Sequence, residues 1–152
     1  MRMVWLGLGA GLMVVSGAAL AQAFAVQPGE WDIAATVNSV DMPGAPPGLA
    51  AAMIGKTKHI SHCITPEEAA RGPQDMMKSD KSCKFTRYSM VGGKLSSEMI
   101  CQQGGGTMTA SSTGSFTSTT FTSSGRSVMK AGPSTMTLTA TTVGKRVGEC
   151  KK

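Results

Sequence analysis

Two histidines three positions apart are the first residues whose chemistry could define a site. His59 and His62 are the only histidines in the 152-residue chain, and Cys63 follows the second. Imidazole nitrogens and methionine sulfur bind copper, and the chain has 12 methionines. The surrounding segment alternates like a β-strand, in which side chains three residues apart point to opposite faces. We therefore expect no chelating histidine pair, and copper binding stands as a third functional hypothesis behind the two given below.

Hydrolytic or phosphate chemistry has little support. A nucleophilic serine needs a base and an orienting acid, and no Gly-x-Ser-x-Gly turn occurs among the many serines. Glycines 104–106 are not followed by the Lys-Ser/Thr pair of a phosphate-binding loop. Glu67 and Glu68 belong to the first turn of an expected helix, where carboxylates favour the positive end of the helix dipole. We expect no enzymatic activity, no catalytic residue, no metal site and no cofactor.

The N-terminal segment has the pattern of an export signal. Arg2 provides a positive start, residues 3–15 are mostly apolar, and residues 16–23 are small and include two Ala-x-Ala sites. We expect a signal peptide at 1–23 and a single β-rich domain at 24–152. The protein would then be secreted into the periplasm, with no stable membrane span after cleavage.

The four cysteines follow the expected cleavage site. An even number in an exported chain predicts two disulfides, and the spacing contains no C-x-x-C pair that would suggest zinc or redox catalysis. Three connectivities are possible for four cysteines. The hairpin described next favours Cys83–Cys101 and leaves Cys63–Cys150.

The chain is organised around the segment 83–101. Two alternating runs flank Gly92 and Gly93, which is a hairpin pattern. Folding the runs about Gly92 through a three-residue turn brings the two flanking cysteines together. The predicted facing pairs are Cys83–Cys101, Phe85–Met99 and Ser89–Leu95.

Alternation predicts further strands on both sides of this hairpin. One covers 27–38, a second covers 56–65, and the Ser/Thr/Gly-rich stretch 107–142 holds several more, with a strand beginning within 116–121 and turns at 124–125 and 131–133. Thr65, Pro66 and Glu68 form a capping-box pattern that opens one short helix, and residues 49–54 allow a single helical turn. The predicted fold is mainly β: an antiparallel meander of six to eight strands, curled into a partial barrel or folded sheet, with one short helix.

The apolar face of this sheet suggests two functions. One is a binding or interaction module for an apolar small molecule or an envelope partner; the alternative is a structural or stress-related envelope protein without a ligand. The net charge of +6 comes from scattered lysines without interleaved aromatics, so we expect no nucleic-acid partner. The large side chains predicted to fill the core or face a ligand are Trp31, Phe85, Met99, Met108, Phe116 and Met136.

The order of these features resembles a family of exported bacterial proteins, domain of unknown function 3617. The resemblance covers nearly the whole mature chain and implies a periplasmic β-rich domain with paired cysteines. It implies no activity. The matching segments are 28–31 (Pro-Gly-Glu-Trp), 42–44 (Met-Pro-Gly), 63–67 (Cys-Ile-Thr-Pro-Glu), the hairpin between Cys83 and Cys101, and 144–150 (Gly-Lys-Arg-Val-Gly-Glu-Cys).

Overall fold

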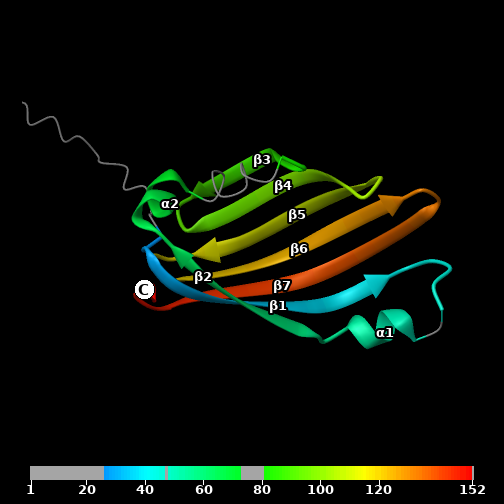
Figure 1. Cartoon of the computed structure of the whole chain (residues 1–152), viewed down its shortest axis with the longest axis horizontal. Helices are drawn as coiled ribbons and strands as arrows, with labels where there is room; N and C mark the ends of the chain where they lie inside the picture. The colour runs from blue at the N-terminus through cyan, green and yellow to red at the C-terminus, as the bar shows by residue number, and fades with distance from the viewer. Residues whose placement is uncertain (1–25, 47, 73–80, 152) are drawn as a thin grey trace, which may run out of the picture.

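The computed structural model describes residues 26–46, 48–72 and 81–151. In this part of the chain seven strands form one antiparallel sheet in the order β2-β1-β7-β6-β5-β4-β3 (Figure 1). The predicted export signal lies outside the described residues. The strands are β1 (Gly29–Asp41), β2 (Thr57–Ile64), β3 (Cys83–Val91), β4 (Lys94–Gln103), β5 (Gly106–Phe116), β6 (Thr120–Ala131) and β7 (Ser134–Gly148), and the helices are α1 (Leu49–Met53) and α2 (Pro66–Arg71).

The prediction of a mainly β, antiparallel fold is confirmed, with two short helices in place of one. Helix α1 forms because Gly48 and Gly55, with φ of 85° and 76°, turn the chain on either side of it. Helix α2 begins with the predicted capping box: the Glu68 amide donates to Thr65 Oγ1 at 3.2 Å, and the Thr65 amide donates to Glu68 Oε2 at 2.8 Å. No helix among the described residues is both long and apolar enough to cross a membrane.

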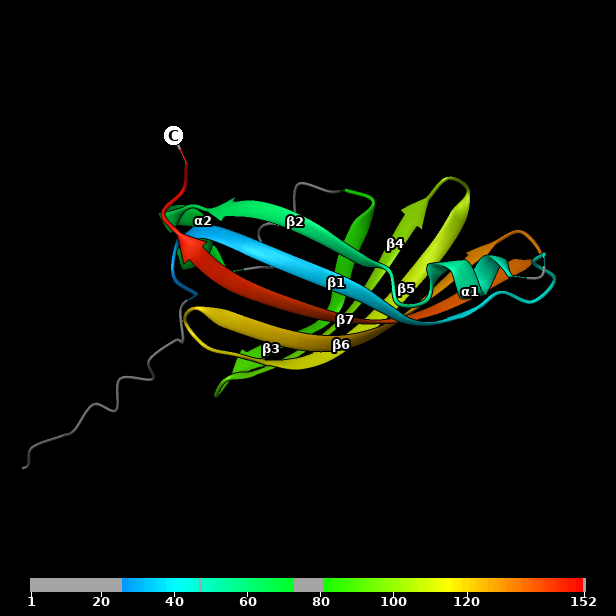
Figure 2. The same ribbon diagram turned by 90° about the horizontal axis from the view of Figure 1, so that it is seen from below.

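The sheet combines a hairpin with a five-stranded meander. Strands β1 and β2 pair with each other, β3 to β7 follow one another in sequence, and the pairing of β7 with β1 joins the two parts. Strands β2 and β3 are therefore the two edges, although they are consecutive in the chain. Seen from below, the sheet is strongly curled, with β2 on one side and β3 and β4 rising on the other (Figure 2).

The central hairpin confirms the cysteine pairing and corrects the turn. Cys83 faces Cys101 and Phe85 faces Met99, as predicted, but the turn has two residues, Gly92 and Gly93, with φ of 58° and 73°. A β-bulge between Phe85 and Arg87 shifts the register by one residue. The prediction for Ser89 was therefore wrong, since Met90 faces Leu95. The shorter turn and the bulge offset each other, so the cysteines still meet.

The turn predicted at 124–125 was wrong, although β6 does begin within 116–121. Phe116 ends β5, Thr120 begins β6, and Gly125 lies inside β6, where no turn occurs. The neighbouring strand leaves little room for a side chain at position 125, since a Cβ on Gly125 would lie 3.1 Å from the Ser111 carbonyl oxygen. The other predicted turn is confirmed, because Ala131 pairs with Ser134 around Gly132-Pro133.

The two faces of the curled sheet differ in chemistry. The face that carries Trp31, which we call the concave face, also takes most of the large apolar side chains of the other strands, as the register shows. The convex face is rich in threonine and serine, and Thr141 Oγ1 accepts a hydrogen bond from Asn38 Nδ2 at 2.8 Å. Among the described residues only Trp31, Cys101 and Phe116 are buried apolar side chains. The concave face is therefore partly open to solvent.

Both disulfides act on the edges of the sheet. Cys83–Cys101 ties edge strand β3 to β4, over a separation of 18 residues. Cys63–Cys150 ties edge strand β2 to the end of the chain beyond β7, over a separation of 87 residues. This is the predicted connectivity, and it gives each edge strand one covalent link.

Removing the disulfides should lower stability according to loop length. In the chain-entropy model, we expect Cys63→Ala/Cys150→Ala to reduce the free energy of unfolding by about 4.5 kcal/mol and Cys83→Ala/Cys101→Ala by about 3 kcal/mol. Urea denaturation of the oxidised variants measures both values. Equal stability of the wild type and either double variant would contradict the assignment of these links as the main restraints on the edges.

The pairing of Phe121 with Gly144 supplies a second prediction. The two residues face each other on β6 and β7, and a Cβ on Gly144 would overlap the Phe121 ring. We expect Gly144→Ala to cost about 1–3 kcal/mol through overpacking. In a Phe121→Ala background the same change should cost little, which a double-mutant cycle by urea denaturation measures. An identical cost in both backgrounds would show that the ring does not occupy this position.

Candidate functional site

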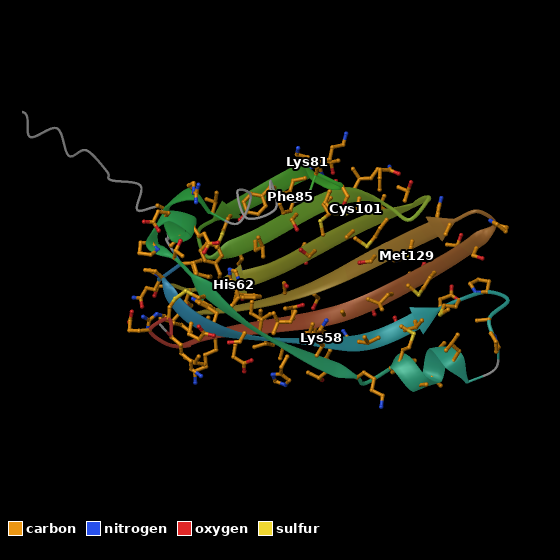
Figure 3. All side chains as sticks on the ribbon, in the orientation of Figure 1. Lys58, His62, Lys81, Phe85, Cys101 and Met129 are labelled. Atoms are coloured by element: carbon orange, nitrogen blue, oxygen red, sulfur yellow. A yellow bond between two sulfur atoms is a disulfide. The ribbon has the colours of Figure 1, made fainter. Side chains whose placement is uncertain are left out.

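An apolar cavity of about 270 Å³ opens on the concave face. Its walls come from β1 to β6, so residues far apart in the sequence meet there; Figure 3 shows His62 and Phe85 reaching it from β2 and β3. We call it the aromatic pocket. Its lining residues are Val26, Trp31, Ile33, His62, Ile64, Phe85, Tyr88, Met90, Leu95, Ser97, Phe116, Thr120 and Phe121.

Two pairs of aromatic rings, one stacked and one tilted, form two walls of the aromatic pocket. The Trp31 and Phe121 rings stack with centroids 6.1 Å apart, and Trp31 Nε1 donates a hydrogen bond to the Gln27 carbonyl at 3.1 Å. Trp31 is 1% exposed, which makes it a fixed part of the wall. On β3, the Phe85 and Tyr88 rings lie 5.2 Å apart with a 60° tilt, a favourable aromatic geometry.

The polar groups of this pocket are few and mostly neutral. The Tyr88 hydroxyl donates to Met90 Sδ at 3.1 Å, and burial raises the pKa of Tyr88, so its phenol is uncharged at neutral pH. His62 Nε2 is shielded from solvent and has no hydrogen-bond partner among the described residues. It lies 3.9 Å from Glu68 Oε2, so α2 places one carboxylate beside this end of the pocket. The arrangement suits the binding of an apolar group.

A second cavity of about 220 Å³ adjoins the first along the concave face. The register explains it: Ser97, Ser112, Gly125 and Ala140 face one another in a row across β4, β5, β6 and β7. Their small side chains leave a hollow that larger residues would fill. We call it the small-residue trough, and its lining residues are Ser97, Met99, Ala110, Ser111, Ser112, Ser123, Gly125, Ser127, Leu138, Ala140 and Thr142.

All six residues predicted to fill the core or face a ligand lie on the concave face. Trp31, Phe85 and Phe116 line the aromatic pocket. Met99 lines the trough. Met108 and Met136 are both register partners of Met129, further along the same face, and line neither cavity.

Sequence reasoning missed several residues of the aromatic pocket. Strand alternation could have found His62, because β2 pairs it with Trp31 and places it on the same face. Met90 was missed because the bulge in β3 reverses which residues of the hairpin face inward. Tyr88, Leu95 and Phe121 are the other large side chains of the pocket that were not singled out.

The two histidines lie on opposite faces of the sheet, as strand alternation predicts. His59 pairs with Ala34 on the convex face and contacts Asp32, with Nδ1 3.3 Å from Oδ1, whereas His62 lies on the concave face. Among the described residues, Glu30, Cys63 and Cys150 form the one cluster of three metal-ligating residue types. Both cysteines of this cluster are joined in a disulfide, so they offer no thiolate.

A comparison with known protein families identifies the family of this chain. Residues 26–150 match the family described as "Protein of unknown function (DUF3617)". Searches of curated proteins and of solved structures give no significant match. Because the family match spans far more than half of the sequence, the chain belongs to the DUF3617 family.

Proposed function

We propose that this protein is a non-enzymatic binding module of the periplasm that holds an apolar small molecule in its aromatic pocket. The observation that carries the proposal is the pocket itself: six strands supply its walls, and its lining is almost wholly apolar. Binding sites for small molecules are concave and mainly apolar, with a few polar groups. The periplasmic location rests on the pattern of the N-terminal segment.

The energetics of the concave face support a ligand. Phe85, Tyr88, Met90 and Leu95 are only partly shielded from solvent, although they are large side chains. Burying apolar surface releases about 25 cal/mol per Å², so an apolar molecule in the pocket would be stabilised on both contact surfaces. A hollow walled by rings suits a small molecule better than an envelope protein, because interfaces between proteins need a much larger area.

The proposal is tested with N-phenyl-1-naphthylamine, a neutral apolar probe that fluoresces when it leaves water. We expect saturable one-to-one binding to the oxidised protein purified from the periplasm. Leu95→Asn places an amide in the apolar wall, and we expect it to weaken binding about tenfold, since such a group costs about 1–3 kcal/mol.

The matched control is Val91→Asn on the same hairpin, where the side chain is 73% exposed and lies outside the pocket. This variant should bind the probe like the wild type. Non-saturable fluorescence, or an equal loss in both variants, would reject the pocket as a binding site and favour the structural role without a ligand.

A further inference from the structure

The aromatic pocket and the small-residue trough are neighbours. Ser97 lines both, and the cavities measure about 270 and 220 Å³. Each alone is smaller than the range of about 300–1,000 Å³ that is typical of small-molecule sites, whereas together they fall within it. A ligand of ordinary size would therefore occupy both.

The combined hollow is long. On β6 it extends from Phe121 of the aromatic pocket to Ser127 of the trough, a distance of six residues. At about 3.3 Å per residue this is about 20 Å. The hydrocarbon chain of a membrane lipid spans about 15 Å, half of a bilayer core of about 30 Å. An unbranched hydrocarbon chain fits this length, and a compact ring system would leave the trough empty.

The charged strand residues described on the concave face are all positive. Among the described strand residues that point to this face, Lys58 and Arg146 are the cations, and none is a carboxylate. Arg146 is already engaged, because it donates to the Pro28 carbonyl at 2.7 Å and pairs with Glu149. Lys58 has no ion pair within the described part of the chain, so its ammonium group is available to an anion.

Lys58 lies at the β2 side of the hollow (Figure 3). It faces Ala35 on β1, which in turn faces Thr142 of the trough on β7. Lys58 and Thr142 are separated by two strand spacings, which is about 10 Å. A lysine side chain and a ligand head group together can span this distance. Glu68 stands at the aromatic end, beside His62, and would repel an anion there. The charge pattern therefore favours an anionic head group near Lys58.

We propose that the ligand is a single-chain anionic amphiphile, with its hydrocarbon chain in the aromatic pocket and the small-residue trough and its head group paired with Lys58. This inference rests on the proposed function and names the ligand class for the same site. The site would recognise the length of the ligand's hydrocarbon chain and the charge of its head group, and each property has its own test.

Chain length is tested by displacing N-phenyl-1-naphthylamine with decanoate, dodecanoate, tetradecanoate and hexadecanoate, all kept below their micelle concentrations. We expect the affinity to rise about fourfold for each added methylene, because each buried methylene contributes about 0.8 kcal/mol. Ala140→Phe fills the trough, so the rise should stop at a shorter chain while binding of the naphthylamine itself persists. Ser124→Phe, on the convex face of β6, is the control and should leave the series unchanged.

Head-group charge is tested with hexadecanoate, hexadecyl phosphate and hexadecanol. We expect either anion to bind several-fold more tightly than the alcohol, and the tighter anion identifies the head group. Lys58→Gln should weaken hexadecanoate about threefold, the range of an exposed ion pair, without affecting hexadecanol. Lys145→Gln on the convex face should change neither.

The two proposals fail in different ways. Saturable naphthylamine binding without any dependence on chain length or head-group charge would overturn the amphiphile and leave the apolar pocket standing. A full chain-length series in Ala140→Phe, or equal binding of acid and alcohol, would also overturn it. Absence of binding by every probe would remove both proposals.

Discussion

Two covalent links hold the edges of an open sheet, and the rest of the structure depends on them. An open seven-stranded sheet has two unpaired edges, and here they are β2 and β3, which follow each other in the chain. Cys63 fixes one edge and Cys83 fixes the other. Few apolar side chains are fully buried in the described part of the chain, so hydrophobic burial alone is a weak restraint on these strands. The disulfides let the sheet keep its curl without a closed core.

The curl and the choice of side chains together create the hollow. Trp31, Phe116 and Phe121 occupy one end of the concave face, and the small residues of β4 to β7 occupy the middle. Large residues in the middle would fill the concavity, as they do in small closed barrels. Here Gly125 and its neighbours leave it open, at the cost of exposing apolar surface to water. An exposed apolar surface of this kind commonly marks a binding site.

The convex face differs from the concave face because its side chains are mainly polar. Its threonines and serines pair with one another across strands, as Thr36 and Thr57 do at 2.8 Å, and its ion pairs are exposed, such as Arg87 with Glu98. Contacts of this kind contribute little individually. The proposed function therefore concerns the concave face, and the description of the DUF3617 family names no activity.

Local alternation and the spacing of a few residues were enough to predict the strand pattern, the capping box of α2 and both disulfides. The alternation also identified the side chains that share the concave face, such as Trp31 and Met99. The three-dimensional structure was needed to find the bulge beside Phe85, the strand that continues through Gly125, and the place of Met90 in the pocket. The physical reason is that register shifts and the curl of a sheet arise from contacts between strands distant in the chain, and no local pattern records them.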